Sequence, residues 1–210
     1  AYRHVFIVPA DGGTARQLTR GNFNHYGSLA WSSDSKHIFF SAYRSDDWEL
    51  VSDEADIYSV SIISSKIKQI TNQPGAERSP VISPNGQYIA FTKEERRPLA
   101  YSPDRIAIMD LDGKNIRILS EDLDGDGNNL MWASDSKSIY YAYDERGIRK
   151  IGRATIKGKL SSVIAGLGGT TIGRPYLSGG FHALNNIIAF THGTSDRPAN
   201  VAMIIDDQIK

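Results

Sequence analysis

The chain has 210 residues, with 24 basic and 24 acidic side chains and a formal net charge of +0 at pH 7. This balance argues against a protein that bulk electrostatics hold to nucleic acid or anionic lipid. Hydrophobic residues make up 40% and charged residues 23%, which is typical of a globular protein, and the absence of cysteine excludes disulfides, thiol catalysis and cysteine metal sites.

The chain opens with a predicted hairpin, in which an apolar run at 5–8 leads through Asp11-Gly12-Gly13 into a second run at 15–19. Further along, three segments repeat one pattern of an apolar run, a polar turn centred on Asp-Ser or Asn-Gly, and another apolar run. These segments are 31–40, 82–91 and 132–141. A second hairpin follows the first two of them, at 56–71 and 105–119.

The repeat has a period of about fifty residues and no helical periodicity. Phe40, Phe91, Tyr141 and Phe190 hold one repeat position. In a looser fourth copy we expect the first strand at 174–178, a longer turn at 179–185 and the second strand at 186–190. Four β-branched and aromatic strands in each unit are typical of a propeller blade.

The predicted fold is therefore all-β, an arc of about four to five four-stranded blades that we expect to form part of a larger ring. Third strands recur five times, at Val5, Ile57, Ile106, Ile151 and Val201. The expected divisions are a half blade at 1–20 and blades at 21–71, 72–120, 121–165 and 166–210. A small closed ring with one surplus strand is the alternative. An open arc leaves blade faces uncovered, which predicts marginal stability and self-association through open blade edges.

The stretch Ser-Pro-Asn-Gly-Gln-Tyr-Ile-Ala-Phe at 83–91 is similar to the propeller repeats of TolB and of the prolyl oligopeptidase family. Three further stretches, at 44–58, 167–176 and 188–199, resemble the amino-terminal propeller of bacterial acylaminoacyl-peptidase-like and dipeptidyl-peptidase-like enzymes. The resemblance covers essentially the whole chain. It implies a propeller that gates an α/β-hydrolase domain of the same polypeptide, so that only short peptides or acyl-amino acids reach a catalytic serine.

No catalytic residue is carried over from this resemblance, because the chain has no Gly-x-Ser-x-Gly nucleophile motif and no histidine in a triad context. We therefore expect no catalysis by this chain alone and no cofactor. The expected partners are the hydrolase domain and a peptide substrate, with no nucleic acid and no membrane. The alternative function is a TolB-type, protein-binding propeller without enzymatic activity.

The long loop at 43–55 is the best candidate contact for substrate or for the hydrolase domain. Trp48 stands there among Arg44, Asp46, Asp47 and Glu49, an aromatic anchor with surrounding charge that is typical of interfaces. The resemblance implies that an acidic group there pairs with a substrate's amino terminus. The simpler interpretation is a solvated loop whose Trp48 covers a neighbouring blade.

Two arginines, Arg174 and Arg197, are further candidate contacts, since each precedes a proline at a blade start or in a loop. Asp122, Asp124 and Asp126 alternate ahead of glycine like the opening of a calcium-binding loop, but Ala133 occupies the place of the closing glutamate. The calcium hypothesis therefore stands beside that of a plain inter-blade turn.

The Glu94-Glu95-Arg96-Arg97 cluster is expected to form exposed pairs within itself. Trp31 and Trp132 are expected in the inter-blade core, and His25 and His192 in polar loops. No apolar run reaches the length of a membrane span and no signal peptide opens the chain. The compartment is left open between bacterial periplasm and cytoplasm, with the periplasm favoured.

Overall fold

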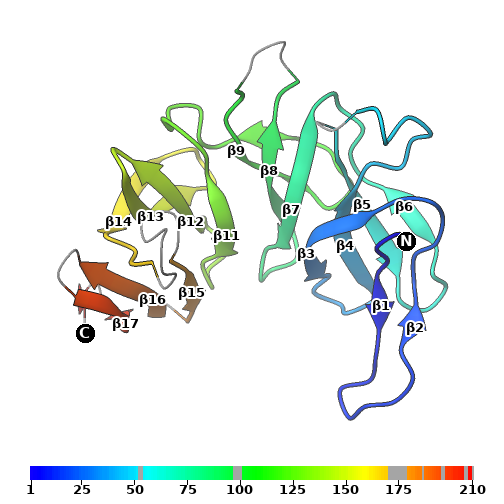
Figure 1. Cartoon of the computed structure of the whole chain (residues 1–210), viewed down its shortest axis with the longest axis horizontal. Helices are drawn as coiled ribbons and strands as arrows, with labels where there is room; N and C mark the ends of the chain where they lie inside the picture. Colours follow the sequence, from blue (N-terminus) through cyan, green and yellow to red (C-terminus); the bar gives the residue numbers. More distant parts are fainter. Residues whose placement is uncertain are drawn as a thin grey trace. The chain divides into compact units, whose positions relative to one another are not determined.

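The computed structural model describes residues 1–51, 54–96, 101–169, 179–185, 187–194, 197–205 and 208–209. All the regular elements in these ranges are β-strands, which confirms the predicted all-β class (Figure 1). Nowhere in the described part of the chain does a helix have the length and apolarity needed to span a membrane. The chain divides into two compact units, residues 1–103 with 107–117, and residues 104–106 with 118–210.

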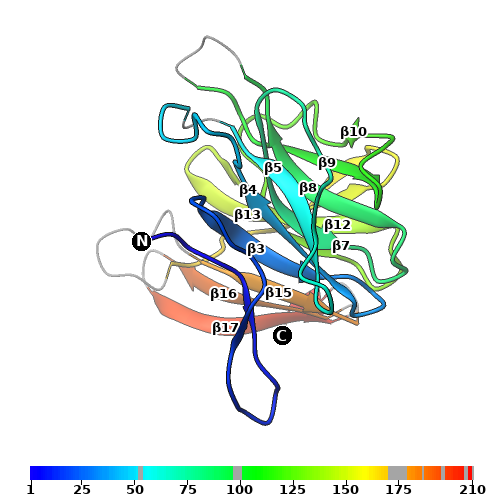
Figure 2. The same ribbon diagram turned by 90° about the vertical axis from the view of Figure 1, so that its right-hand side faces the viewer.

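The first unit begins with a two-stranded hairpin and continues with a four-stranded antiparallel sheet in the order β3-β4-β5-β6. The hairpin extends away from this sheet in two perpendicular views (Figures 1 and 2). Its strands are β1 (Phe6–Ile7) and β2 (Arg16–Gln17). The sheet consists of β3 (His25–Trp31), β4 (His37–Ala42), β5 (Asp56–Ser61) and β6 (Ile67–Gln69).

Three more four-stranded sheets follow, each built from strands consecutive in the chain. The division between the two units passes through β9 and β10 of the first of them. That sheet contains β7 (Ala76–Ile82), β8 (Tyr88–Glu94), β9 (Arg105–Asp110) and β10 (Arg117–Ile118). The next contains β11 (Asn128–Trp132), β12 (Ser138–Glu145), β13 (Ile148–Thr155) and β14 (Leu160–Ala165). The last contains β15 (Phe181–Leu184), β16 (Ile187–Thr194), β17 (Arg197–Ile205) and β18 (Gln208–Ile209). Successive sheets of this kind are the blades of a partial β-propeller.

The first strand of the last sheet differs from the prediction. Residues 181–184 form β15, in the segment that was expected to be a turn, and Asn185 makes the tight turn with a positive φ of 49°. Phe181 is 6% exposed and pairs with Phe190 in β16. The two glycines at 179–180 suggested a turn, whereas the strand alternation of Phe-His-Ala-Leu begins directly after them. The strand expected at 174–178 lies outside the described residues.

In each of the first three repeats, a buried hydroxyl accepts a hydrogen bond from the backbone at the start of the third strand. The side-chain oxygens of Thr19, Thr71 and Ser120 accept hydrogen bonds from the backbone N–H groups fourteen residues earlier, at distances of 2.9, 2.8 and 2.8 Å. The donors are Val5, Ile57 and Ile106. Each hydroxyl residue is at most 3% exposed, so this bond satisfies backbone groups that water cannot reach.

The predicted hairpin turns are confirmed by their backbone angles. Ser35, Gly86 and Ser136 occupy equivalent turn positions and all have a positive φ. In the second copy the Ser83 hydroxyl donates to Asn85 Oδ1 at 2.7 Å and accepts from the N–H groups of Gln87 and Tyr88 at 3.2 and 2.9 Å. Ser32 makes the corresponding bonds in the first copy.

Replacing Ser83 by alanine should lower the free energy of unfolding by about 1–2 kcal/mol, because it removes the buried hydroxyl that accepts from two backbone N–H groups and donates to Asn85. Ser83 is 1% exposed, so water cannot take over these bonds. Urea denaturation would measure the loss. Ser33→Ala is the control, since Ser33 is exposed and has no hydrogen bond among the described residues. Equal stability of the Ser83 and Ser33 variants would contradict the assigned role.

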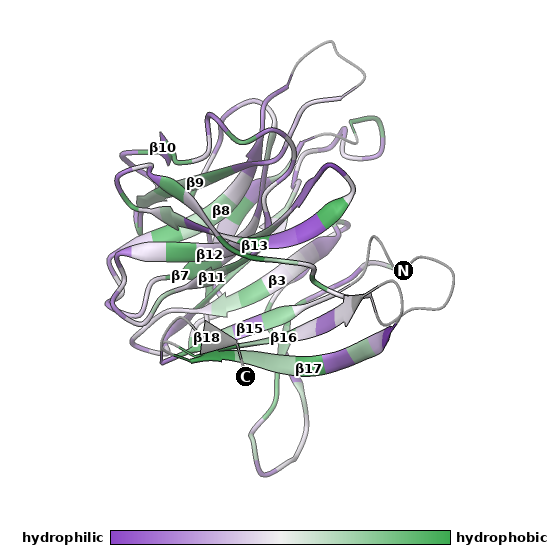
Figure 3. Cartoon of the chain, turned by 90° about the vertical axis from the view of Figure 1, so that its left-hand side faces the viewer, coloured by the Kyte–Doolittle hydropathy of each residue, from purple (hydrophilic) through white to green (hydrophobic). Residues whose placement is uncertain are grey.

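Equivalent positions in the blades differ in burial at the end of the array. Ile57, Ile106 and Ile151 are each 0% exposed, whereas Val201, their counterpart in β17, is 77% exposed. Met203 on the same face of β17 is 42% exposed. Figure 3 shows a hydrophobic part of β17 in the foreground, with no other element in front of it. Self-association through this face stays a prediction.

The prediction for Trp31 is wrong. Trp132 is buried at 8% exposure, but Trp31 is 48% exposed, together with Leu29 on the same face of β3. The preceding hairpin packs Val5 and Leu18 into a cluster with residues of β4 and β5, and this cluster includes no residue of β3. The outer face of the first strand in the array therefore stays open.

Candidate functional site

A cleft of about 530 Å³ lies beside the candidate loop in the first unit. Tyr43, Trp48 and Val51 of the loop form part of its wall. The remaining wall comes from β3, from the chain before it and from the segment just before β5. These lining residues are Ala1, Arg3, Asn24, Tyr26 and Glu54. A cleft of this size, with aromatic and polar side chains in its wall, fits a small ligand or a short peptide segment.

Backbone hydrogen bonds between residues three positions apart shape the loop that carries Trp48. The N–H of Trp48 donates to Ser45 O at 3.2 Å, and the N–H of Leu50 donates to Asp47 O at 2.8 Å. Trp48 is half-buried and meets the Tyr2 ring edge-on, with 5.8 Å between ring centroids. The contact with Tyr2 therefore packs the Trp48 indole against the N-terminal segment at the cleft wall.

The acidic residues singled out from the sequence lie outside the cleft wall. Asp46, Asp47 and Glu49 are exposed, and none of them is among the residues that line the cleft. Asp47 has a lowered pKa because the Ser45 hydroxyl bonds to its carboxylate. The carboxylate at the cleft is that of Glu54, which the sequence analysis did not name as a site residue. In the sequence, Glu54 begins the Glu-Ala-Asp-Ile-Tyr stretch at 54–58, which is part of the family resemblance and could have pointed to this residue.

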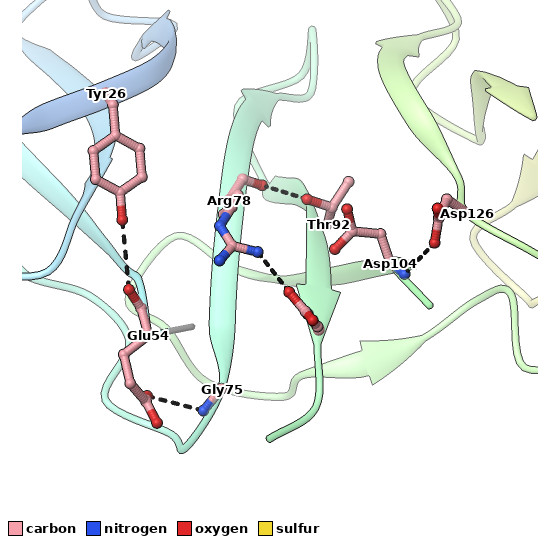
Figure 4. A network of polar contacts seen from close by, with 8 residues as sticks. Tyr26, Glu54, Gly75, Arg78, Thr92, Asp104 and Asp126 are labelled. Atoms are coloured by element: carbon pink, nitrogen blue, oxygen red, sulfur yellow. Dashed lines mark hydrogen bonds and ion pairs between the residues drawn. The ribbon is translucent and has the colours of Figure 1, made fainter. Parts of the chain in front are cut away.

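Glu54 is held by contacts from two neighbouring segments (Figure 4). Its Oε2 accepts a hydrogen bond from the N–H of Gly75 at 3.0 Å, and Arg96 Nη1 lies 3.1 Å from its Oε1. The Tyr26 hydroxyl reaches the Glu54 carbonyl oxygen at 3.5 Å. Glu54 is 9% exposed, so its carboxylate is fixed in place at the edge of the cleft.

Gly75 is required for this arrangement. Its φ is +103°, and a Cβ at this position would lie 2.2 Å from the carbonyl oxygen of Glu94. Only glycine combines this backbone angle with so close an approach. The turn at Gly75 thereby aims its N–H at Glu54 and places Arg96 alongside.

Two members of the charged cluster at 94–97, Glu94 and Arg96, pair with residues outside it, contrary to the prediction for these two. Glu94 Oε2 accepts from Arg78 Nη1 at 2.8 Å across the β7–β8 pair, and Arg96 reaches Glu54. Figure 4 shows the Arg78 contact beside the Glu54 contacts. Arg97 lies outside the described residues. Antiparallel pairing brings these groups together, and sequence adjacency does not reveal it.

Arg44 is a structural residue and does not line the cleft. Its Nη1 lies 2.5 Å from His25 Nε2 and 3.3 Å from Arg20 O, and its guanidinium stacks over the Phe23 ring at 4.8 Å. Since arginine only donates, His25 Nε2 accepts and the Nδ1–H donates to Arg3 O at 2.8 Å. Burial, with Arg44 and His4 nearby, lowers the pKa of His25.

The two histidines expected in loops lie in strands instead. His25 begins β3 and is 6% exposed. His192 lies in β16, where its Nδ1 is 3.2 Å from Gly166 O. Their polar neighbours in the sequence suggested loops, whereas backbone carbonyls from other segments satisfy both rings.

The remaining candidates belong to the second unit. Asp126 Oδ1 accepts from the N–H of Asp104 at 2.9 Å, and Asp122 and Asp124 are exposed on the same loop (Figure 4). No group of three His, Asp or Glu residues in the described part of the chain is arranged to hold a metal ion. Arg197 begins β17 and is exposed, and Arg174 lies outside the described residues.

The chain is similar in sequence and fold to peptidase and TolB propellers. Residues 1–97 match the family model of the dipeptidyl peptidase IV (DPP IV) N-terminal region. The chain is 26% identical to Dipeptidyl-peptidase 5 of Porphyromonas gingivalis over 178 residues, which is 78% of this chain and 26% of that protein. It is also 26% identical to the Tol-Pal system protein TolB of Francisella tularensis over 156 residues, which is 74% of this chain and 33% of TolB.

The crystal structure of TolB from Acinetobacter baumannii superposes with a TM-score of 0.66 and 20% identity, over 94% of this chain and 45% of that one. At this identity the superposition shows a shared propeller fold. These matches confirm the predicted resemblance to an N-terminal peptidase propeller with TolB-like repeats. The chain spans about a third or less of the two sequence relatives named here.

Proposed function

We propose that this propeller is the non-catalytic, substrate-gating portion of a serine peptidase that hydrolyses short peptides or acyl-amino acids. The observation that carries the proposal is the match of residues 1–97 to the DPP IV N-terminal region. That range contains the candidate loop, Glu54, Arg96 and every described residue that lines the cleft. The proposed partner is an α/β-hydrolase domain of the same polypeptide.

In this proposal the cleft receives the amino-terminal end of a peptide. Glu54 offers a fixed carboxylate to the ammonium group, and Trp48 and Tyr43 offer aromatic faces to the first side chain. Arg96 pairs with Glu54 before the peptide arrives. Because the Arg96 side chain is 64% exposed, it can turn into solvent at little cost when an ammonium group takes its place.

A second candidate function is a TolB-type propeller that binds another protein and has no enzymatic activity. The observation that favours it is the TolB resemblance, which covers 74% of the chain in sequence and 94% in structure. On this alternative the exposed Trp31 and Leu29 of β3 and the loop face around Trp48 are the contact surfaces. The two candidates differ in whether the gene product contains a nucleophilic serine.

Labelling with a fluorophosphonate probe separates the two functions. The probe would be applied to this chain and, in parallel, to the full-length gene product that contains it. Labelling of the full-length product alone supports the peptidase. Absence of labelling in both, with the full-length protein folded by circular dichroism, rejects the peptidase and favours the binding propeller.

The role of Glu54 predicts a substrate-dependent defect. In the full-length product, Glu54→Gln is expected to lower kcat/KM about tenfold for peptides with a free amino terminus, because a charge-assisted hydrogen bond is lost. For the same peptides with an acetylated amino terminus we expect almost no change. Glu49→Gln is the matched control, since Glu49 is an exposed loop carboxylate outside the cleft wall. Equal defects for free and acetylated peptides would rule out this role.

A further inference from the structure

A second, smaller cleft of about 270 Å³ lies in the second unit, on the face of β12 that carries Tyr141 and Tyr143. Its wall contains three acidic residues, two tyrosines, two serines and two leucines. These are Asp122, Leu123, Asp124, Tyr141, Tyr143, Glu145, Leu160, Ser161 and Ser162. The described lining includes no basic side chain. The volume is below that of most ligand sites, so it suits one side-chain-sized group.

Tyr141 forms the floor of this cleft in an unusual way. It is 2% exposed and lies opposite Gly152 of β13, which in turn lies opposite Ser162 of β14. A Cβ on Gly152 would come within 2.4 Å of the Tyr141 ring and 2.6 Å of its hydroxyl oxygen. The absence of a side chain at Gly152 therefore lets the phenol lie across β13, with its hydroxyl toward β14. A glycine in mid-strand costs stability, and here it makes room for this ring.

No hydrogen bond joins the hydroxyl of Tyr141 or Tyr143 to a described residue, and neither oxygen is among the fully buried atoms without a partner, so both hydroxyls are accessible at the cleft. Tyr143 is 8% exposed, and its ring centroid lies 5.5 Å from that of Tyr141. Buried tyrosines normally find a partner for the hydroxyl. Burial raises the pKa of Tyr141 to about 12, so its phenol is neutral and both donates and accepts. Two such hydroxyls at one cleft are available to bond to a polar ligand.

The charge of the cleft identifies the class of that ligand. Asp122 and Asp124 are exposed and form no ion pair or hydrogen bond with any described residue. Glu145 is neutralised by Lys150. The backbone between the aspartates is held in place, because Arg105 donates to Ser120 O at 3.2 Å and also to Leu123 O. The cleft thus presents two carboxylates that form no ion pair, on a loop whose backbone Arg105 holds in place.

We propose that this cleft binds a guanidinium group, as carried by an arginine side chain of a peptide or protein. A planar guanidinium has five donors in a fixed fork, which match the carboxylates of Asp122 and Asp124 and the hydroxyl oxygens of Tyr141 and Tyr143. Its flat face also stacks on aromatic rings. The site is separate from the Glu54 cleft, and it does not depend on the peptidase proposal.

The test is an NMR titration of the 210-residue chain with N-acetyl-L-arginine amide at low ionic strength. N-acetyl-L-citrulline amide, which has nearly the same shape without the charge, is the ligand control. We expect millimolar binding of the arginine compound, amide shifts confined to residues 122–124, 141–145 and 160–162, and at least tenfold weaker binding of the citrulline compound. Added salt should weaken the binding.

Variants separate this site from nonspecific attraction. Tyr141→Phe keeps the ring and should weaken binding about threefold to tenfold through the lost hydroxyl. The double variant Asp122→Asn/Asp124→Asn alters only exposed positions, so it should fold and should weaken binding by about fivefold or more. Glu121→Gln is the control, because it removes an exposed negative charge next to Asp122 but outside the cleft wall. This variant should bind the arginine compound as the parent chain does.

Several results would overturn the proposal. These are equal binding of the arginine and citrulline compounds, amide shifts located elsewhere, or unchanged affinity in the double variant. Tight binding of calcium chloride at the same amides, with displacement of the arginine compound, would also overturn it in favour of a metal site at Asp122, Asp124 and Asp126.

Discussion

Replacing Lys93 by methionine is expected to lower the free energy of unfolding at pH 7 by about 3 kcal/mol, because it leaves a buried carboxylate without its partner. Lys93 and Glu77 are cross-strand neighbours in β8 and β7 and form an ion pair, with Glu77 at 0% exposure. Lys93 Nζ also donates to Gln73 Oε1 at 3.0 Å. Burial raises the pKa of Glu77, and Lys93 opposes that rise.

The loss should depend on pH in a defined direction. Without Lys93, the pKa of Glu77 in the folded state rises further above its unfolded value, so the variant is most stable in acid and loses stability as the pH rises. Urea denaturation at pH 5 and pH 8 would measure both the loss and its slope. Lys114→Met is the matched control, because the Lys114 side chain is 76% exposed and its pair with Asp112 is open to solvent. Similar losses in the two variants would refute the role of burial.

A double variant shows whether the loss comes from the orphaned charge. When both members of a buried pair are replaced by apolar residues of similar size, stability is often retained. We therefore expect Glu77→Leu/Lys93→Met to recover most of the stability that Lys93→Met loses. A double variant as unstable as the single one would show that packing at these positions, and not charge pairing, is decisive.

The repeat and its turns could be predicted from the sequence because they depend on local rules. Alternation of apolar and polar residues defines a strand, and Asn85-Gly86 defines a turn with positive φ. What covers a residue is a non-local property. Trp31 and Trp132 share a repeat position, yet only Trp132 is buried. Sequence equivalence alone does not show which of two equivalent residues is covered by its neighbours in the fold.

The sequence pointed to the loop at 43–55 and its charged residues, but not to Glu54. Composition favours the exposed Asp46 and Asp47, whereas the cleft carboxylate is Glu54, at the end of the loop where backbone pairing with the next blade begins. Arg44 was predicted as a contact residue, and its position against His25 and Phe23 makes it structural. Contacts across strands decided both cases, and their register follows only from the folded sheets.

Asp56 gives the second large expected effect, a stability that falls as the pH rises. Its carboxyl group is 8% exposed and has a pKa raised to about 6, mainly by burial and also by Glu77. Hydrogen bonds from Gln69 at 3.0 Å and Thr71 at 3.3 Å only partly offset this. A raised carboxyl pKa means that its stability contribution is complete below about pH 4 and is lost as the pH passes about 6.

Across that range the ionisation of Asp56 should cost on the order of 2–3 kcal/mol. Asp56→Asn cannot ionise, so its free energy of unfolding should vary less between pH 4 and pH 7.5 than that of the parent chain. At pH 7.5 the variant should be the more stable of the two. Denaturant titrations at five pH values would give both curves.

Asp34→Asn is a control with the opposite expected pH dependence, because the Ser32 hydroxyl lowers the pKa of the exposed Asp34. Asp34 therefore adds stability at neutral pH that is lost in acid. Parallel curves for the parent and the Asp56 variant would place the ionisation of Asp56 outside this pH range and remove the proposed cost of its burial.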